Sequence, residues 1–218
     1  MLLQLAVDTP AGFAVLAQVH DLVDIVEVGT PVLKRFGLGA IATARELAPG
    51  VPVLADTKTV DAGDTEARMM FAAGARFLTV LSCASPATIT AVIEAAREYG
   101  GHVVVDTMTE RSISDLVGRS YPSGVAYLSL HSATDARLAG HDSTKTVIDI
   151  AAVARGAGWR FSMAGGIDRS SLPEVVAAQP DVVVVGSAIT SADDPRGVTR
   201  WMRDQLTHPG HGWPSAVK

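Results

Sequence analysis

Three charged side chains, Asp56, Lys58 and Asp61, follow the apolar residues 53–55 within six positions. Chain that leaves a buried strand is usually rich in turn-forming residues, so this cluster of charges is unusual for folding alone. Two carboxylates beside an ammonium group can bind a metal ion or transfer protons. The segment therefore indicates an enzyme.

Carboxylates also accompany two earlier apolar runs, because Asp8 follows residues 2–7 and Glu27 lies inside residues 25–28. A lone carboxylate in an apolar strand must be paired, protonated or metal-bound to offset its loss of hydration, which favours a functional interpretation of Glu27. Asp8 has two equally good interpretations, as a site residue or as the cap of the following helix. Asp61 also fits the start of a helix, where a carboxylate is favourable.

The types of these side chains suggest one kind of chemistry. Glu27 and Asp56 supply hard oxygen ligands of the kind that Mg²⁺ takes, with Mn²⁺ as the alternative metal. Lys58 would place a second positive charge beside a developing oxyanion. His131 follows the apolar residues 126–130, a position that favours a proton carrier over the commoner structural histidine. Together these groups predict formation of a carbanion beside a carbonyl.

Glycine-bearing turns follow the last two apolar runs of the chain. Gly165 and Gly166 come after residues 160–163, and Gly186 and Ser187 come after residues 182–185. Each turn alone is weak evidence, since glycine often ends a strand. As a pair, they match the place where barrels bind phosphate through backbone N–H groups. The sequence therefore predicts a phosphorylated substrate.

The elements that must position these residues alternate between short β-branched runs and helix-forming segments such as 85–99 and 144–157. The expected strands are residues 2–7, 25–28, 53–55, 77–80, 102–105, 126–130, 160–163 and 182–185. Eight such units predict a closed (β/α)₈ TIM barrel, an α/β fold. An open doubly wound sheet is the alternative, but it would require a glycine-rich dinucleotide fingerprint after its first strand.

Composition narrows the class of protein. The chain has 218 residues, of which 48% are hydrophobic and 19% charged, and its formal net charge is −5. We expect one catalytic domain over residues 1–207 and a flexible tail over 208–218. The scattered basic residues argue against nucleic-acid binding, and the short apolar runs argue against membrane insertion, so a cytoplasmic protein is expected. The single cysteine, Cys83, is interpreted as a small core residue.

Several motifs resemble those of the orotidine monophosphate decarboxylase suprafamily. The chain is most similar to the Mg²⁺-dependent branch that contains hexulose phosphate synthases and keto-gulonate phosphate decarboxylases, over nearly its whole length to about residue 206. The motifs are LQLAVD at 3–8, VEVGTP at 26–31, ADTKTVDAG at 55–63, AGG at 164–166 and VGSAIT at 185–190.

This resemblance implies a role for each candidate residue. Glu27 and Asp56 match the family's Mg²⁺ ligands, and Asp8 matches a contact to a substrate hydroxyl. Lys58 matches the lysine that stabilises an enediolate, and His131 matches the acid/base histidine. Asp61 matches a residue contributed across a dimer interface, so the resemblance implies a homodimer in which each active site is completed by the neighbour.

Four positions distinguish the two activities of this branch. The decarboxylases typically have glutamate at the end of strand five, arginine three residues after the histidine, threonine before the paired glycines and arginine after the last strand's glycine. This chain has Asp106, Thr134, Ala164 and Ser187 there, which favours the synthase. Amides of Gly186 and Ser187 would then bind phosphate without an arginine clamp.

Two features lie between the branches. Residues 135–140 (Asp-Ala-Arg-Leu-Ala-Gly) resemble the decarboxylases, and residues 82–84 (Ser-Cys-Ala) replace a glycine-containing turn of the synthases. The resemblance implies an aldolase that joins formaldehyde to D-ribulose 5-phosphate. Decarboxylation of 3-keto-L-gulonate 6-phosphate and a non-catalytic sugar-phosphate-binding barrel are the alternatives.

Overall fold

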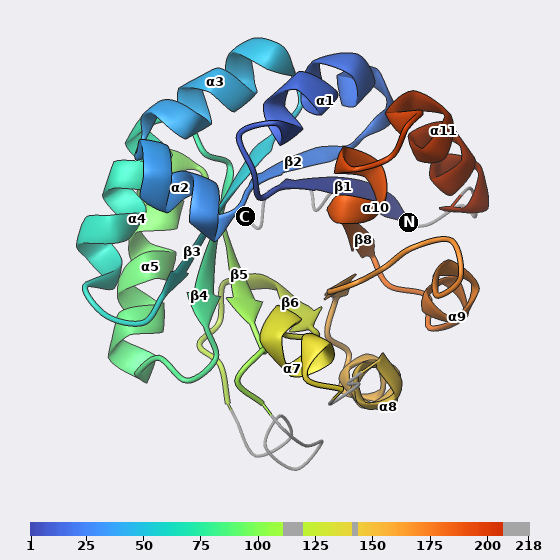
Figure 1. Cartoon of the computed structure of the whole chain (residues 1–218). Helices are drawn as coiled ribbons and strands as arrows, with labels where there is room; N and C mark the ends of the chain where they lie inside the picture. Colours follow the sequence, from blue (N-terminus) through green and yellow to red (C-terminus); the bar gives the residue numbers. More distant parts are fainter. Residues whose placement is uncertain (111–119, 141–143, 207–218) are drawn as a thin grey trace.

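A closed barrel of parallel strands forms the centre of the molecule (Figure 1). The computed structural model describes residues 1–110, 120–140 and 144–206. In this part of the chain, neighbouring strands pair in sequence order, and β8 pairs with β1 to close the barrel. The strands are β1 (Leu2–Val7), β2 (Ile25–Val28), β3 (Val53–Thr59), β4 (Phe77–Leu81), β5 (His102–Asp106), β6 (Val125–His131), β7 (Phe161–Ala164) and β8 (Val182–Val185). The predicted (β/α)₈ barrel is therefore confirmed.

Helices surround the barrel and cover the outer faces of the strands (Figure 1). They are α1 (Gly12–Val19), the 3₁₀ turn η1 (His20–Leu22), α2 (Thr30–Phe36), α3 (Gly39–Leu47), α4 (Gly63–Ala72), α5 (Pro86–Tyr99), α7 (Thr134–Leu138), α8 (Thr144–Gly156), α9 (Leu172–Ala177), α10 (Ser187–Thr190) and α11 (Pro195–Leu206). The two helices predicted from spacing, α5 and α8, each differ from the expected range by one residue at one end. The predicted tail lies outside the described residues, and the domain boundary at residue 207 stays a prediction.

Local sequence explains where the longest helix begins and ends. Ser85 accepts a hydrogen bond from the backbone N–H of Thr88 at 3.0 Å, and Pro86 occupies the first helical position. Both features favour a helix start, because they satisfy or remove donors that have no partner in the first turn. Gly100 then adopts φ 64°, the left-handed conformation that ends helices. Helix α5 is thereby fixed between the fourth and fifth strands.

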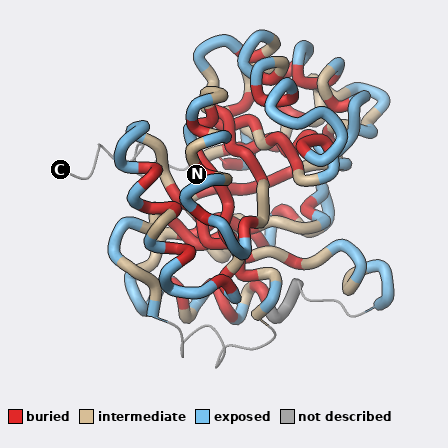
Figure 2. The backbone as a smooth tube through the Cα atoms, turned by 90° about the vertical axis from the view of Figure 1, so that its left-hand side faces the viewer, coloured by how far each residue is buried: buried red, intermediate tan, exposed pale blue. Residues whose placement is uncertain are grey.

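Side chains alternate along each strand between the helix-covered face and the barrel interior. The interior cluster at one end of the barrel is apolar and consists of Ala6, Ile25, Leu54, Phe77, Val104, Tyr127, Val182 and Val184. Figure 2 shows that buried backbone is concentrated in the strands and on the helix faces that pack against them. Two residues further along several strands, the same interior face carries polar side chains. The barrel thus directs Glu27, Asp56, Asp106 and His131 to one place.

Strand β3 is longer than the sequence predicts. The expected strand ends at residue 55, whereas β3 continues to Thr59. Its register against β4 shifts between Ala55, which pairs with Leu78, and Thr59, which pairs with Val80. A bulge of this kind redirects side chains without ending the strand. Asp56 and Lys58 are therefore held by the sheet and do not lie in a loop, whereas Asp61 follows the end of β3.

Candidate active site

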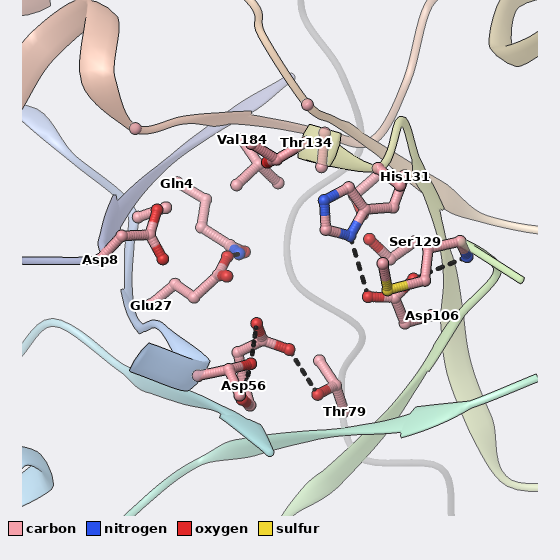
Figure 3. A pocket seen from close by; sticks show the side chains of 18 of the residues that line it. Gln4, Asp8, Glu27, Asp56, Thr79, Asp106, Ser129, His131, Thr134 and Val184 are labelled. Carbon is pink, nitrogen blue, oxygen red and sulfur yellow. Dashed lines mark hydrogen bonds and ion pairs between the residues drawn. The ribbon is translucent and has the colours of Figure 1, made fainter. Parts of the chain in front are cut away.

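A cavity of about 550 Å³ opens where the strands end, and residues of all eight strands or of the turns after them line it. This is the end of a TIM barrel at which active sites lie. Figure 3 shows the side chains of Asp8 and Glu27 facing that of His131 across the cavity. The predicted site residues that line it are Asp8, Glu27, Asp56, Lys58, Asp106, His131, Ala164, Gly165, Gly166, Gly186 and Ser187.

Glu27 projects from β2 into the cavity beside a glutamine. The Nε2 atom of Gln4 donates a hydrogen bond to Oε2 of Glu27 at 2.5 Å, while Oε1 of Gln4 is buried without a hydrogen-bond partner among the described residues. Burial, together with the negative charges of Asp56 and Asp8, raises the pKa of Glu27 to about 8. A carboxylate in such surroundings is stabilised by an added cation.

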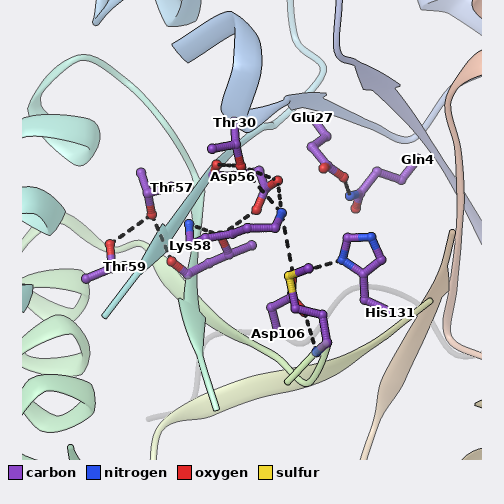
Figure 4. Close-up of polar contacts among 11 residues, drawn as sticks. Gln4, Glu27, Thr30, Asp56, Thr57, Lys58, Thr59, Asp106 and His131 are labelled. Carbon is purple, nitrogen blue, oxygen red and sulfur yellow. Dashed lines mark hydrogen bonds and ion pairs between the residues drawn. The ribbon is translucent and has the colours of Figure 1, made fainter. Parts of the chain in front are cut away.

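Asp56 is held in place by three partners, of which Thr79 is labelled in Figure 3 and Thr30 and Lys58 in Figure 4. Its Oδ1 accepts a hydrogen bond from the hydroxyl of Thr79 at 2.7 Å, and its Oδ2 accepts one from Thr30 at 2.8 Å. The ammonium group of Lys58 forms a close ion pair with the same Oδ2 atom. Asp56 is 4% exposed, so the orientation of its carboxylate is determined by these contacts and not by solvent.

The bulge of β3 aims Lys58 at the cavity. Lys58 adopts φ 49°, a conformation that residues with a side chain rarely take, and its backbone N–H donates to the hydroxyl of Thr79 at 2.9 Å. Burial alone would lower the pKa of Lys58, but the negative charges of Asp56 and Asp106 raise it above its ordinary value. Lys58 therefore remains a cation in the middle of a group of carboxylates.

Asp106 links the lysine to the histidine. Its Oδ2 lies 3.0 Å from Nδ1 of His131 and 3.6 Å from Nζ of Lys58, and its Oδ1 accepts a hydrogen bond from the backbone N–H of Met108. Burial would raise the pKa of Asp106, but the hydrogen bond and charge of His131 hold it below its usual range. Burial would lower the pKa of His131, but the hydrogen bond to Asp106 raises it. The pair favours an ionised carboxylate and an oriented imidazole.

Asp8 belongs to the cavity, and its interpretation as a helix cap is wrong. Helix α1 begins after Ala11, and no side chain caps it. Burial and the nearby charge of Asp56 raise the pKa of Asp8. A Cβ atom at Gly29 would lie 2.0 Å from Oδ1 of Asp8, so the glycine after β2 leaves space for this carboxylate.

The glycine turn after β7 also forms part of the wall. Gly165 and Gly166 have φ values of +102° and +70°, which favour glycine. A Cβ atom at Gly165 would lie 2.3 Å from the backbone oxygen of Ser132, so the turn packs closely against the chain after β6. Together with Gly186 and Ser187, the turn gives this side of the cavity a surface of backbone and small side chains.

Asp61 and Cys83 are both exposed, but only the interpretation of Cys83 is contradicted. The expected role of Asp61 across a dimer interface stays a prediction. Asp61 is exposed and is not among the residues that line the cavity. It precedes Ala62, which adopts the left-handed conformation before α4 begins. Cys83 is exposed in the turn before α5, so its interpretation as a core residue is wrong. Polar neighbours and a turn make exposure favourable there.

The sequence did not identify several polar residues that line the cavity, among them Gln4, Thr79, Tyr127 and Arg137. Gln4 and Thr79 lie on inward positions of β1 and β4, Tyr127 lies on β6, and Arg137 lies on α7. Gln4 precedes Asp8 by four residues and so shares its face of the strand, a signal that period-two spacing could have supplied. Arg137 carries no comparable signal, because its direction depends on how α7 packs.

The cavity offers oxygen ligands for a metal ion. In residues 1–110, 120–140 and 144–206, no group of three or more His, Cys, Asp or Glu side chains is arranged to hold a metal ion by itself. Two carboxylates, Glu27 and Asp56, face the cavity beside the buried, unpaired oxygen of Gln4. This set suits Mg²⁺, which takes one or two carboxylates and keeps other oxygen ligands.

None of the described helices is long and apolar enough to cross a membrane.

Known proteins resemble this chain over most of its length. The 3-hexulose-6-phosphate synthase of Bacillus subtilis (strain 168) is 36% identical over 197 residues, which cover 89% of this chain and 93% of that protein. The crystal structure of 3-hexulose-6-phosphate synthase from Salmonella typhimurium is 39% identical, has a TM-score of 0.85 and covers 94% of this chain and 98% of that one. The crystal structure of 3-keto-L-gulonate-6-phosphate decarboxylase from Vibrio cholerae is 28% identical, has a TM-score of 0.78 and covers 94% of this chain and 96% of that one.

The family itself follows from a match along the chain. Residues 1–201 match the sequence model of the orotidine 5'-phosphate decarboxylase / HUMPS family. This matched range includes every strand of the barrel and the residues that line the cavity. The resemblance inferred from motifs is thus confirmed by an independent comparison. This chain is a member of the orotidine 5'-phosphate decarboxylase / HUMPS family.

Proposed function

We propose that this protein is a 3-hexulose-6-phosphate synthase, a formaldehyde-lyase that condenses formaldehyde with D-ribulose 5-phosphate to give D-arabino-3-hexulose 6-phosphate. The observation that carries the proposal is that Lys58 and His131 both contact Asp106 in one cavity and that Glu27 faces them there. This arrangement suits removal of a proton beside a carbonyl and stabilisation of the resulting charge. Synthases from two organisms are also more similar to this chain than the decarboxylase described above.

His131 is the proposed proton carrier. In the neutral imidazole, Nδ1 of His131 carries the proton and donates a hydrogen bond to Asp106 at 3.0 Å. Nε2 then carries no proton and can take one from C1 of the ketose. The electron pair of the broken C–H bond forms the C1=C2 double bond, and the C2 oxygen becomes negative. C1 then attacks formaldehyde, the C2 carbonyl forms again, and His131 returns its proton to the formaldehyde oxygen. Atoms and charge are balanced over the two steps.

Lys58 is the proposed stabiliser of the negative oxygen. Asp56 and Asp106 keep the ammonium group protonated and hold it at the cavity surface. A fixed cation in a site shielded from water stabilises developing charge more strongly than water does. Asp8, on the opposite wall, would accept hydrogen bonds from substrate hydroxyls.

Glu27 and Asp56 would hold a divalent metal ion, Mg²⁺ or alternatively Mn²⁺. Bound there, the ion would polarise the substrate carbonyl as a Lewis acid. The fit rests on the buried carboxylate of Glu27, whose ionisation is opposed by Asp56 and Asp8, and on the unpaired oxygen of Gln4 beside it. Thr30 and Thr79 orient Asp56 by hydrogen bonds.

The glycine-lined side of the cavity would take the phosphate group. Ala164, Gly165, Gly166, Gly186 and Ser187 line this side, where no Cβ atom of a larger residue blocks access to the backbone. Backbone N–H groups at such turns bind phosphate oxygens. The substrate would then extend from the phosphate side to the carboxylates and His131.

We also propose a homodimer in which Asp61 reaches the cavity of the neighbouring subunit. Asp61 is exposed and does not line its own subunit's cavity, so a role in catalysis requires another chain. Val60 and Met69, on either side of it in the sequence, are 53% and 47% exposed. Phe36, at the end of α2, is also exposed, and α2 packs beside β3. Exposed apolar side chains that gather on one face are typical of an interface.

The first experiment measures formaldehyde consumption by the purified protein with D-ribulose 5-phosphate, in the presence of Mg²⁺ and after its removal with a chelator. Mass spectrometry then identifies the sugar product. The proposal expects Mg²⁺-dependent loss of formaldehyde and a hexulose phosphate product. Absence of this reaction, with release of CO₂ from 3-keto-L-gulonate 6-phosphate, would establish the decarboxylase instead. Sugar-phosphate binding without either reaction would indicate a non-catalytic barrel.

A further inference from the structure

The wall of the cavity carries more negative than positive charge. Among the described residues that line it, five are carboxylic acids: Asp8, Glu27, Asp56, Asp106 and Asp135. Two lining residues, Lys58 and Arg137, are permanent cations. Lys58 is paired with two of the carboxylates. Arg137 forms no ion pair with any residue that the structure describes, so its charge is available to a ligand.

Arg137 lies beside the glycine turn after β7. It belongs to the short helix α7, which follows β6 at the rim of the barrel (Figure 1). A Cβ atom added to Gly166 would lie 2.8 Å from both Cζ and Nε of Arg137. The missing side chain at this glycine therefore makes the space that the guanidinium group occupies. The arginine lies directly against the part of the wall that we assign to the phosphate.

The guanidinium group has an unsatisfied donor at this place. Nε of Arg137 is buried and has no hydrogen-bond partner among the described residues. A buried charged donor without an acceptor is costly, and native proteins rarely retain one without a reason. Asp135 precedes Arg137 by two residues on α7, and side chains two apart on a helix do not face each other. An acceptor is therefore expected from a molecule in the cavity.

The neighbouring wall cannot balance the charge of a phosphate monoester by itself. Gly165, Gly166, Gly186 and Ser187 have uncharged side chains. A phosphate ester carries a charge between about −1.5 and −2 at neutral pH. Lys58 is held at the carboxylate side by Asp56. Among the described residues that line the cavity, Arg137 is the cation beside the glycine turn.

We propose that Arg137 donates hydrogen bonds from its guanidinium group to the phosphate of the sugar phosphate, over the turn formed by Gly165 and Gly166. This inference rests on the proposed function for the presence of a phosphorylated substrate. It revises the expectation from the sequence that the phosphate is bound by backbone amides without an arginine. The planar guanidinium presents several donors in a fixed geometry that matches phosphate oxygens. The decarboxylases have an arginine at the position of Ser187, whereas in this chain the proposed phosphate-binding arginine lies on α7.

The test compares Arg137→Gln with the wild type and with the control Arg200→Gln. Arg200 is exposed on α11 and does not line the cavity. Calorimetry gives the dissociation constants of inorganic phosphate and D-ribulose 5-phosphate without formaldehyde, and steady-state kinetics gives KM and kcat. The proposal expects Arg137→Gln to raise both dissociation constants and the KM for D-ribulose 5-phosphate roughly 10- to 100-fold, as for loss of a charged hydrogen bond. The KM for formaldehyde and the melting temperature should be nearly unchanged.

Two further measurements separate phosphate binding from a packing role. Arg137→Gln should not alter the turnover of unphosphorylated D-ribulose. Arg137→Lys should raise the dissociation constant of D-ribulose 5-phosphate by only a few-fold, because it keeps the charge and loses the planar geometry. If Arg137→Gln does not fold, Arg137→Lys carries the test, and a wild-type dissociation constant in that variant would overturn the assignment.

The outcomes also separate this inference from the proposed function. Wild-type affinity for phosphate and D-ribulose 5-phosphate in folded Arg137→Gln would overturn the role of Arg137, even if the enzyme is a synthase. Weaker phosphate binding in Arg137→Gln, in a protein that consumes no formaldehyde, would support the role of Arg137 and contradict the synthase.

Discussion

Asp106 connects the two side chains that we propose to handle the proton and the negative charge. One of its oxygens lies 3.0 Å from His131 and 3.6 Å from Lys58, and the residue is 2% exposed. The carboxylate raises the pKa of both partners by stabilising their charged forms. A buried carboxylate that orients a histidine also fixes which ring nitrogen carries the proton. The properties of the base thus depend on a neighbour that does not itself remove the proton.

Asp106→Asn should shift the pH dependence of the reaction. His131 acts as a base only when neutral, so kcat/KM should rise with pH through its raised pKa. Removing the negative charge lowers that pKa, and the acidic limb of the profile should move to lower pH, while the plateau falls roughly 10²-fold or more. The profile and the NMR titration of His131 measure the two effects. Asp21→Asn, at a surface ion pair, is the control. An unchanged titration of His131 would refute the coupling.

Glu27→Gln should alter how stability depends on pH. The folded-state pKa of Glu27, about 8, lies above its ordinary value of 4.5. Its contribution to the stability of the metal-free protein is therefore complete below pH 4.5 and is lost as pH rises through 8. The melting temperature of metal-free Glu27→Gln should decline less over this range. Mg²⁺ should raise the melting temperature of the wild type at pH 8 and leave that of the variant nearly unchanged.

The matched control is Glu94→Gln, at an exposed position of α5. It should follow the wild type both in the pH series and in the response to Mg²⁺. An equal response of Glu27→Gln and the wild type to Mg²⁺ would remove Glu27 from the proposed ligands. Formaldehyde consumption by Glu27→Gln should fall sharply, which ties the ligand to the activity.

Two irregular elements shape the cavity walls. Asp56 and Lys58 both line the cavity from β3, whose register against β4 shifts between Ala55 and Thr59 and in which Lys58 adopts φ 49°. The turn after β7 uses two glycines with positive φ to approach the chain after β6. Such conformations are disfavoured for most residues and persist where surrounding structure holds them in place. Both irregular elements carry residues that line the cavity.

Gly165→Ala should destabilise the protein more than Gly158→Ala. The two glycines have φ values of +102° and +79°, but a Cβ atom at Gly165 would lie 2.3 Å from a backbone oxygen, and one at Gly158 would meet nothing within 4 Å. Backbone strain should cost about 1–2 kcal/mol at both sites. The clash should add ~1–3 kcal/mol at Gly165. Urea unfolding measures both, and equal losses would show that the turn relaxes without cost.

At the level of the whole molecule, closure of the barrel brings the predicted site residues into one cavity, with the exception of Asp61. Residues from all eight strands or their following turns reach the same cavity, whereas Asp61 stays at the surface. Val60, which precedes Asp61, and Met69, on α4, also have exposed apolar side chains. The proposed homodimer explains both observations, because a second subunit would cover these side chains and receive Asp61.

Mixing Lys58→Ala with Asp61→Ala tests that shared site. Each variant alone should lose most activity. In randomly exchanged twofold dimers, half the molecules are heterodimers with one intact site, so activity should recover to about one quarter of the wild type. Denaturation and refolding of the mixture allows the exchange, and gel filtration gives the size. Absence of recovery in a mixture shown to contain heterodimers would place Asp61 outside the neighbour's site.

The sequence by itself determined the barrel and most of the cavity. Strands with β-branched residues alternate with helical segments, and the spacing of apolar residues along the sequence is enough to predict this order of elements. The bounds of β1, β2 and β8 agree with those expected. Asp8, Glu27, Asp56 and His131 were identifiable because strand ends meet at one side of a barrel.

Only the tertiary structure decided the features that depend on approach between distant segments. The length of β3 depends on its pairing with β4, and the exposure of Cys83 depends on the turn that packs around it. Asp106 acquires its partners from β3 and β6. Arg137 meets Gly166 across two separate turns, a contact that no spacing in the sequence encodes. Local patterns specify which elements form, whereas packing specifies which side chains meet.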